Sequence, residues 1–219
     1  VIRRNLLSGD VESDAATSAL KYHGFAGEAE YDVLVAEHYG DQVIGVGIGR
    51  GIGGAQWSAD LVVTDTDRDT YVQWVTNISY SWVFADKNMS GALEYHFNGF
   101  GQKNGDYGVQ ALPGNPDLLA RLTRGEMFTV GRHYLAASVL IELTPLWTVS
   151  PTILSNMEDP SALLQLISNY SLSDNATLLG SLNLPLGRSG TEFGGIQTLA
   201  PEQYLSTSSG VFLQFAWYF

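Results

Sequence analysis

The chain has 219 residues, of which 45% are hydrophobic and 11% aromatic, and its formal net charge is −12. So acidic a chain lacks the basic surface that displaces counterions from phosphates, and its composition therefore disfavours nucleic-acid binding. The lack of cysteine excludes disulfides and thiolate metal sites, and no apolar run approaches the ~18 residues of a membrane-spanning helix. No Pro-rich or Ser/Gly-rich linker divides the sequence, so we predict a single domain over residues 1–219.

The first residues, Val-Ile-Arg-Arg-Asn-Leu-Leu, have no initiator Met and no apolar core of a signal peptide. We expect either a chain whose signal was removed or, as we favour, the C-terminal portion of a longer one. The polar segment that follows, residues 8–17, is predicted to be a loop.

Alternation of apolar and polar residues predicts β-strands over most of the remaining chain. The first group spans residues 18–25, 30–38, 42–49, 56–64, 71–84 and 89–99. In the longest of these, residues 71–84, one face carries Trp74, Tyr80 and Trp82. The opposite face is polar. Strands with this pattern are expected to have one face in contact with water.

The pattern breaks between residues 101 and 131, where Gly, Asn, Asp and Pro dominate at first. Asn115 or Asp117 is expected to cap one short helix there, through Leu118, Leu119 and Leu122. Alternation resumes over residues 132–143, 146–156, 161–171 and 176–184, and a last strand follows a second long loop. The total is eleven strands, or twelve if residues 2–7 form one.

The alternation is compatible with two all-β folds, a transmembrane barrel and a soluble sandwich, and loop length distinguishes between them. A soluble sandwich alternates equally well. If the C-terminus is placed at the periplasm, the connections 39–41, 65–69, 101–131, 157–160 and 185–207 fall outside, and every periplasmic turn is short. We therefore predict an all-β, antiparallel up-and-down transmembrane β-barrel of about twelve strands, possibly a fragment of a larger barrel, with long extracellular loops near 101–131 and 185–207.

Two short motifs invite ligand sites, and both are better explained by turns. Gly49-Arg-Gly-Ile-Gly-Gly54 matches the dinucleotide pattern, but a strand follows it where a helix is required. Asp65-Thr-Asp-Arg-Asp69 resembles the start of a calcium loop but has Thr70 and Thr76 at the positions of the required Gly and Glu. No metal ligand and no cofactor is predicted.

The polar faces of the predicted strands carry ionisable side chains that a barrel would point into its lumen. They would either line a water-filled path or pair and plug a narrow one. The predicted lumen-lining residues are Lys21, His23, Asp32, His38, Asp60, Glu94, His96, Arg132 and Glu142.

The final strand, residues 210–219, has one purely apolar face that ends in aromatic residues. This segment resembles the C-terminal strand of Gram-negative outer-membrane β-barrels, which their assembly machinery reads. The residues of this expected assembly signal are Val211, Leu213, Phe215, Trp217 and Phe219. The stretches 77–82 and 93–99 are also similar to an uncharacterised proteobacterial family of porin-like barrels whose members extend further at the N-terminus.

This resemblance implies a location in the bacterial outer membrane, with membrane lipid and the barrel-assembly machinery as partners, and it supplies no catalytic residues. The favoured function is a porin-like channel for small solutes. One alternative is a structural or interaction barrel with loop 101–131 as its recognition surface. Another is a membrane-embedded hydrolase, because His96-Phe-Asn-Gly99 invites comparison with the His-x-Ser-Asn-Gly motif of outer-membrane phospholipase A. The serine of that motif is missing, so we predict no enzyme.

Overall fold

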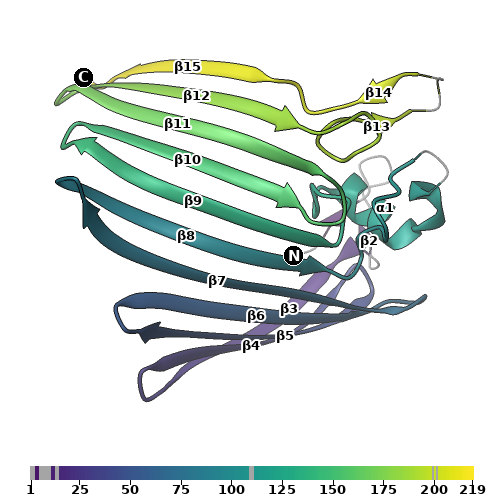
Figure 1. Ribbon diagram of the computed structural model, residues 1–219. Coiled ribbons are helices and arrows are strands. Elements are labelled where there is room, and N and C mark those ends of the chain that lie inside the picture. Colours follow the sequence, from purple (N-terminus) through teal and green to yellow (C-terminus); the bar gives the residue numbers. More distant parts are fainter. Residues whose placement is uncertain (1–2, 5–10, 13–14, 109–110, 199, 201) are drawn as a thin grey trace.

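A single antiparallel sheet of eleven strands forms almost the whole molecule (Figure 1). The computed structural model describes the chain except residues 1–2, 5–10, 13–14, 109–110, 199 and 201. The first six strands of the sheet are β3 (Thr17–Ala26), β4 (Ala29–His38), β5 (Asp41–Ile52), β6 (Ala55–Asp65), β7 (Thr70–Phe84) and β8 (Lys87–Asn98). The others are β9 (His133–Thr144), β10 (Trp147–Asn156), β11 (Ser161–Ser173), β12 (Ala176–Leu186) and β15 (Gly210–Trp217).

Each strand pairs with its neighbour in this order, from β3 at one edge to β15 at the other. The predicted all-β, up-and-down antiparallel fold is therefore confirmed, and each of the eleven predicted strands corresponds to one strand of the sheet. Most of the possible twelfth strand, residues 2–7, lies outside the described residues. Its described part, β1 (Arg3–Arg4), pairs with β2 (Val11–Glu12) in a separate hairpin. A third small sheet joins β13 (Ile196–Gln197) to β14 (Tyr204–Leu205) within the second long loop.

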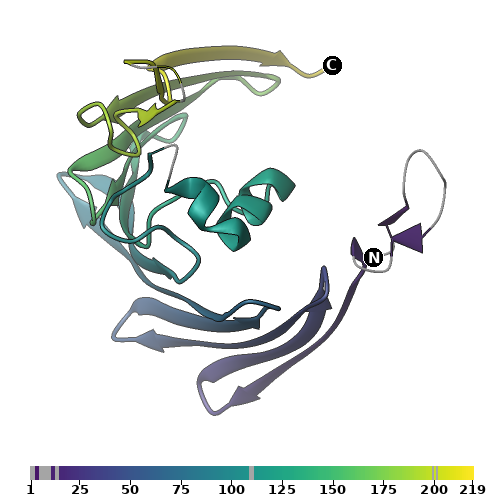
Figure 2. The same ribbon diagram turned by 90° about the vertical axis from the view of Figure 1, so that its right-hand side faces the viewer.

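The sheet bends into a deep trough that is not closed (Figure 2). Among the described strands, β3 pairs only with β4 and β15 only with β12, so the two edges remain apart. Each edge leaves a row of backbone hydrogen-bonding groups without a strand partner. The strand order and the curvature of the sheet thus agree with the predicted barrel fold. The described strands do not close into the expected ring.

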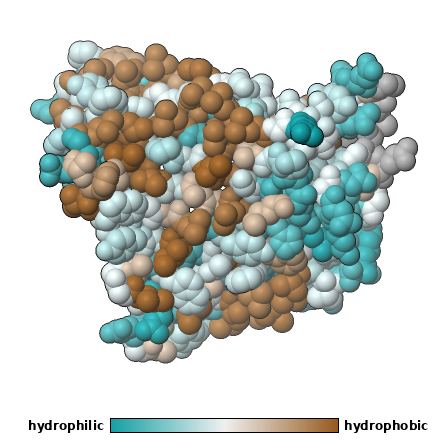
Figure 3. Space-filling model, viewed as in Figure 1, coloured by the Kyte–Doolittle hydropathy of each residue, from teal (hydrophilic) through white to brown (hydrophobic). Residues whose placement is uncertain are grey.

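The convex face of the sheet is covered with apolar side chains, and no second layer of the described structure packs on it. Leu20 of β3 is 72% exposed and Val211 of β15 is 82% exposed, and both side chains lie on this face. Figure 3 shows hydrophobic side chains gathered over the strands on this face and hydrophilic ones over the loop end. An exposed apolar face of this extent marks a surface that contacts another protein or a membrane.

Both long loops lie at one end of the sheet, and the described connections at the other end are all two-residue turns (Figure 1). At the turn end, Ala85 and Asp86 both have positive φ, at 50° and 57°, in a two-residue hairpin whose twist matches the strands. The other end, called the mouth here, carries the loops 66–69, 99–132, 157–160 and 187–209. The buried apolar side chains of the molecule concentrate at the mouth, among them Phe100, Tyr107, Leu118 and Tyr134.

The part of the chain that the structure describes contains no helix long and apolar enough to cross a membrane.

Candidate functional site

The segment between β8 and β9, residues 99–132, is called the inner loop here because it folds into the concave side of the sheet (Figure 2). It contains the helix α1 (Pro116–Arg124), preceded by the short 3-10 helix η2 (Leu112–Gly114). The Asn115 side chain caps α1 by accepting a hydrogen bond from the Leu118 amide at 3.2 Å. Gly125 ends the helix in the left-handed region, at φ 72°. The predicted helix is confirmed, with Asn115 rather than Asp117 as its cap.

Close backbone contacts turn the chain inward at the base of the inner loop. The Gly99 amide donates to the Val72 carbonyl at 2.9 Å, and a Cβ on Gly99 would collide with the Val72 backbone. A Cβ on Gly101 would likewise collide with the Gly131 carbonyl. Both positions therefore require glycine, because the two ends of the loop pass against the wall and against each other.

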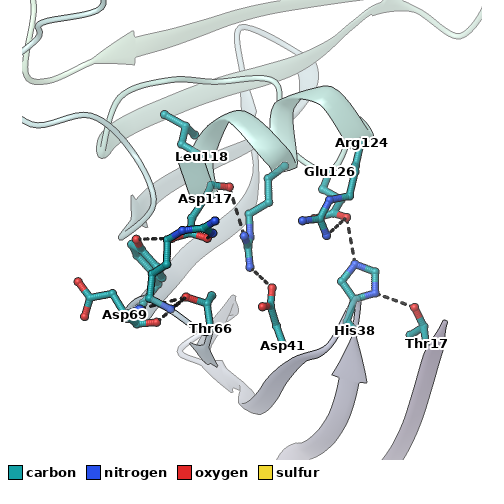
Figure 4. Close-up of polar contacts among 12 residues, drawn as sticks. Thr17, His38, Asp41, Thr66, Asp69, Asp117, Leu118, Arg124 and Glu126 are labelled. Atoms are coloured by element: carbon teal, nitrogen blue, oxygen red, sulfur yellow. Dashed lines mark hydrogen bonds and ion pairs between the residues drawn. The ribbon is translucent and has the colours of Figure 1, made fainter. Parts of the chain in front are cut away.

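Ion pairs attach α1 to β5 and to the loop 66–69, and a hydrogen bond attaches it to β7 (Figure 4). Arg121 donates from Nη2 to Asp41 Oδ2 at 2.6 Å, and its side chain is only 6% exposed. Asp117 accepts from Arg68 Nη1 and from the Tyr71 hydroxyl, each at 3.0 Å. We call Asp41, Arg68, Asp117 and Arg121, with their partners, the charged anchor.

The C-terminal end of α1 extends the charged anchor toward the sheet edge. Glu126 Oε1 lies 3.1 Å from His38 Nε2 and 3.4 Å from Arg124 Nη1. The guanidinium of Arg124 stacks 4.2 Å from the centre of the Tyr39 ring. Thr17 of the edge strand lies 2.7 Å from His38 Nδ1, so a chain of polar contacts connects the helix to β3.

On the opposite side, a buried hydrogen-bond network attaches the inner loop to β9, β10 and the second long loop. Its centre is Glu192, which is 9% exposed. Glu192 accepts from the Val130 amide at 2.8 Å and from the Tyr134 hydroxyl and Asn156 Nδ2 at 2.7 Å each. Asn156 also donates to the Tyr107 hydroxyl at 2.6 Å. These residues form what we call the buried anchor.

Burial raises the pKa of the Glu192 carboxyl above its ordinary value, although the hydrogen bonds from Tyr134, Val130 and Asn156 oppose that shift. Burial likewise raises the pKa of the Tyr107 hydroxyl. Removal from water disfavours the ionised form of each group. The buried anchor is thus a site in which charge is costly and hydrogen bonds must be complete.

Two cavities remain beside the inner loop. One, of about 210 Å³, lies between the loop and the wall, and Val62, Thr64 and Gln73 line it opposite Arg121 and Met127. The other, of about 480 Å³, has a polar lining that includes Arg68, Lys103, Asp106 and Arg132. The inner loop therefore narrows the trough at the mouth without filling it.

The predicted lumen-lining residues do not form one cluster. Asp32 lies 3.1 Å from Lys21 Nζ and 3.0 Å from His23 Nδ1 near the edge strand. His38 belongs to the charged anchor. Arg132 precedes β9 instead of lying within it, and its Nε donates to the Gly101 carbonyl at 2.8 Å.

The remaining four lie on the strand faces that turn to the concave side: Asp60, Glu94, His96 and Glu142. Glu142 accepts from Asn88 Nδ2 at 2.7 Å. Because the sheet is open, the role of all nine as the lining of a lumen stays a prediction.

Sequence reasoning missed Asp41, Asp117, Arg121 and Glu192, which hold the inner loop in place. Asp41 lies in a predicted hairpin turn, Asp117 and Arg121 in or beside the short helix predicted within loop 101–131, and Glu192 in the second long loop, and strand alternation gives no orientation at any of these places. A weak indication was available, because the predicted helix carries an acidic residue in its first turn, Asp117, and basic residues in its last turn, Arg121 and Arg124.

The expected assembly-signal residues Val211, Leu213, Phe215 and Trp217 lie on the convex face of β15 and are more than half exposed. Phe219 lies beyond the end of β15. The preceding residue, Tyr218, still donates its amide to the Asn175 carbonyl at 2.8 Å. Recognition by assembly machinery stays a prediction.

The comparison with outer-membrane phospholipase gains no support from the surroundings of His96. Among the described residues, His96 stacks on Tyr134 with ring centres 6.3 Å apart and has no hydrogen bond to a serine or a carboxylate. Within the same residues, no group of three or more His, Asp or Glu side chains is placed to hold a metal ion.

Comparison with known proteins yields one structural likeness. No family model and no curated protein matches the chain. A solved structure titled as a porin superposes with a TM-score of 0.48 at 15% sequence identity. The match covers 85% of this chain and 62% of the porin, so the chain spans less than two thirds of that protein's length.

Proposed function

We propose that this chain forms an outer-membrane β-barrel that passes small polar solutes, with the inner loop narrowing the passage at the mouth. The observation that carries the proposal is the combination of an exposed apolar convex face with a helix held by ion pairs inside the concave face. Membrane lipid would contact the convex face. The mouth would face the exterior and the tight turns the periplasm.

A closed wall is part of this proposal, because an open trough in a bilayer would expose backbone groups of β3 and β15 to lipid. Closure requires both edges to gain partners, from each other or from further strands. Assembly through β15 would then read the apolar face of the strand that contains Val211 and Trp217.

Planar-bilayer recording with the detergent-purified protein tests the proposal. Discrete single-channel steps are expected from the folded protein, identified by its heat-modifiable migration on gels, and none from a boiled sample. A folded barrel that carries no current at any voltage would contradict a channel and would favour an interaction barrel.

The role of the inner loop has its own test. The substitution Arg121→Ala removes the partner of Asp41 and loosens the attachment of α1 to the wall. We expect a larger or noisier single-channel conductance than in wild type. Arg188→Ala, an exposed change in the second long loop at the same end of the sheet, is the matched control and should leave conductance unchanged.

A further inference from the structure

The concave face of the sheet carries far more negative than positive charge. Strand register places six carboxylates on it, and of the described Lys and Arg side chains in the sheet only Lys21 shares that face. The carboxylates are Glu30, Asp32, Asp41, Asp60, Glu94 and Glu142.

Internal pairing neutralises part of this charge and leaves the rest exposed. Lys21 pairs with Asp32, Arg121 pairs with Asp41, and Asn88 donates to Glu142. Among the described residues, no ion pair or hydrogen bond engages the side chains of Glu30, Asp60 and Glu94. All three are exposed.

A column of glycines on β5 gives two of these carboxylates their position. Asp60 is the register partner of Gly47, and a Cβ on Gly47 would collide with its Oδ1. Glu30 is the partner of Gly49, whose Cβ would lie 2.8 Å from Glu30 Oε1. The carboxylates of Asp60 and Glu30 therefore lie directly over the glycine backbone of β5. Their oxygens, rather than alkyl groups, form the concave surface at these positions.

The three carboxylates are spread along the wall and do not form an ion-binding cluster. Glu30 and Glu94 lie in one row of cross-strand partners that runs from β4 to β8, and Asp60 lies one inward-facing position nearer the mouth. Adjacent strands are about 4.8 Å apart, which makes the span of that row roughly 19 Å. A field of one sign along such a wall acts on every passing ion.

We propose that the passage is selective for cations and that Glu30, Asp60 and Glu94 are the residues that set this selectivity. The inference rests on the proposed channel function and adds the charge class of its solutes: monovalent inorganic or small organic cations pass in preference to anions. Coulomb attraction from three unpaired carboxylates supplies the preference, and salt screens it.

Zero-current potentials across a tenfold KCl gradient test the sign. For wild type we expect a K⁺ to Cl⁻ permeability ratio of about five at roughly 0.05 M salt, falling as salt rises. Each of Glu30→Gln, Asp60→Asn and Glu94→Gln should lower the ratio, and the triple variant should bring it to about one. Gel heat-modifiability confirms that each variant is folded.

Glu37→Gln is the matched control. Glu37 lies on β4 with Glu30 but on the convex face, so its removal should leave the ratio unchanged. Conducting wild-type channels with a ratio at or below one, or a triple variant as selective as wild type, would overturn the assignment while leaving the channel intact. A folded protein without conductance would instead overturn the channel, and this inference with it.

Discussion

The two sides of the inner loop are held by different physical means. On the β4–β7 side, ion pairs hold the loop, and their cations range from Arg68, which is 61% exposed, to Arg121, which is 6% exposed. On the β9–β12 side, Glu192 collects three hydrogen bonds where hardly any water reaches it. An exposed ion pair stabilises the folded state by less than about 1 kcal/mol. A buried polar group that loses its hydrogen-bond partner destabilises the folded state by more than that.

This difference divides the inner loop into a firm end and a yielding end. The buried anchor lies near Val130, where the loop rejoins β9, and the charged anchor lies along α1. If the loop opens, we expect α1 to leave the wall first while residues 130–132 stay in place. The predictions below test this order, beginning with the largest expected effect.

Glu192→Ala should open the firm end. The substitution leaves the Val130 amide, the Tyr134 hydroxyl and one Asn156 donor without their acceptor, which costs about 3–5 kcal/mol at a buried site. Amide hydrogen exchange at Val130 and Gly131 should accelerate by at least about 100-fold.

Asp174→Ala provides the control for that experiment, since Asp174 is an exposed acidic residue in a tight turn at the opposite end of the sheet. It should leave exchange at Val130 unchanged. Equal exchange rates in wild type and the Glu192 variant would contradict the buried anchor.

Arg121→Ala should open the yielding end alone. It removes the contact with Asp41 at 2.6 Å and the guanidinium stacked 3.8 Å from the centre of the Phe100 ring. The expected cost is about 2 kcal/mol, from a pair that is mostly but not fully buried. Exchange of the α1 amides should accelerate about 30-fold while that of Val130 stays as in wild type. Equal acceleration at both places would mean that the loop moves as one body.

The sequence predicted the sheet far better than the inner loop. Alternation is a property of neighbouring residues, so all eleven strands could be located, including residues 71–84 with their aromatic face. The inner loop depends on contacts between distant residues: Arg121 with Asp41 across 80 positions and Glu126 with His38 across 88. No local pattern specifies such pairs, and residues 101–131 were accordingly expected only as a long extracellular loop with one short helix, with a recognition surface as an alternative role.

The pH dependence of the firm end follows from the raised pKa of Glu192. Because folding favours the protonated carboxyl, its stabilising contribution is complete below the unfolded-state pKa, about 4.5, and is lost as pH rises through the higher folded-state pKa. The opening free energy at Val130, taken from exchange corrected for intrinsic rates, should therefore fall as pH rises above the ordinary carboxyl pKa of 4.5. Glu192→Gln should remove this slope, and an unchanged slope in that variant would assign it to another group.

Added salt should produce the smallest effect and should act on one end only. Raising ionic strength from about 0.05 to 0.5 M shortens the screening length to a few ångströms, which weakens the exposed pairs of Arg68 and Arg124 more than the buried pair of Arg121. We expect the α1 amides to exchange about two- to fourfold faster, a loss below 1 kcal/mol. Val130 should keep its wild-type rate, because hydrogen bonds to a buried carboxyl are little screened. A salt response of equal size at Val130 would show that the two anchors are not electrostatically distinct.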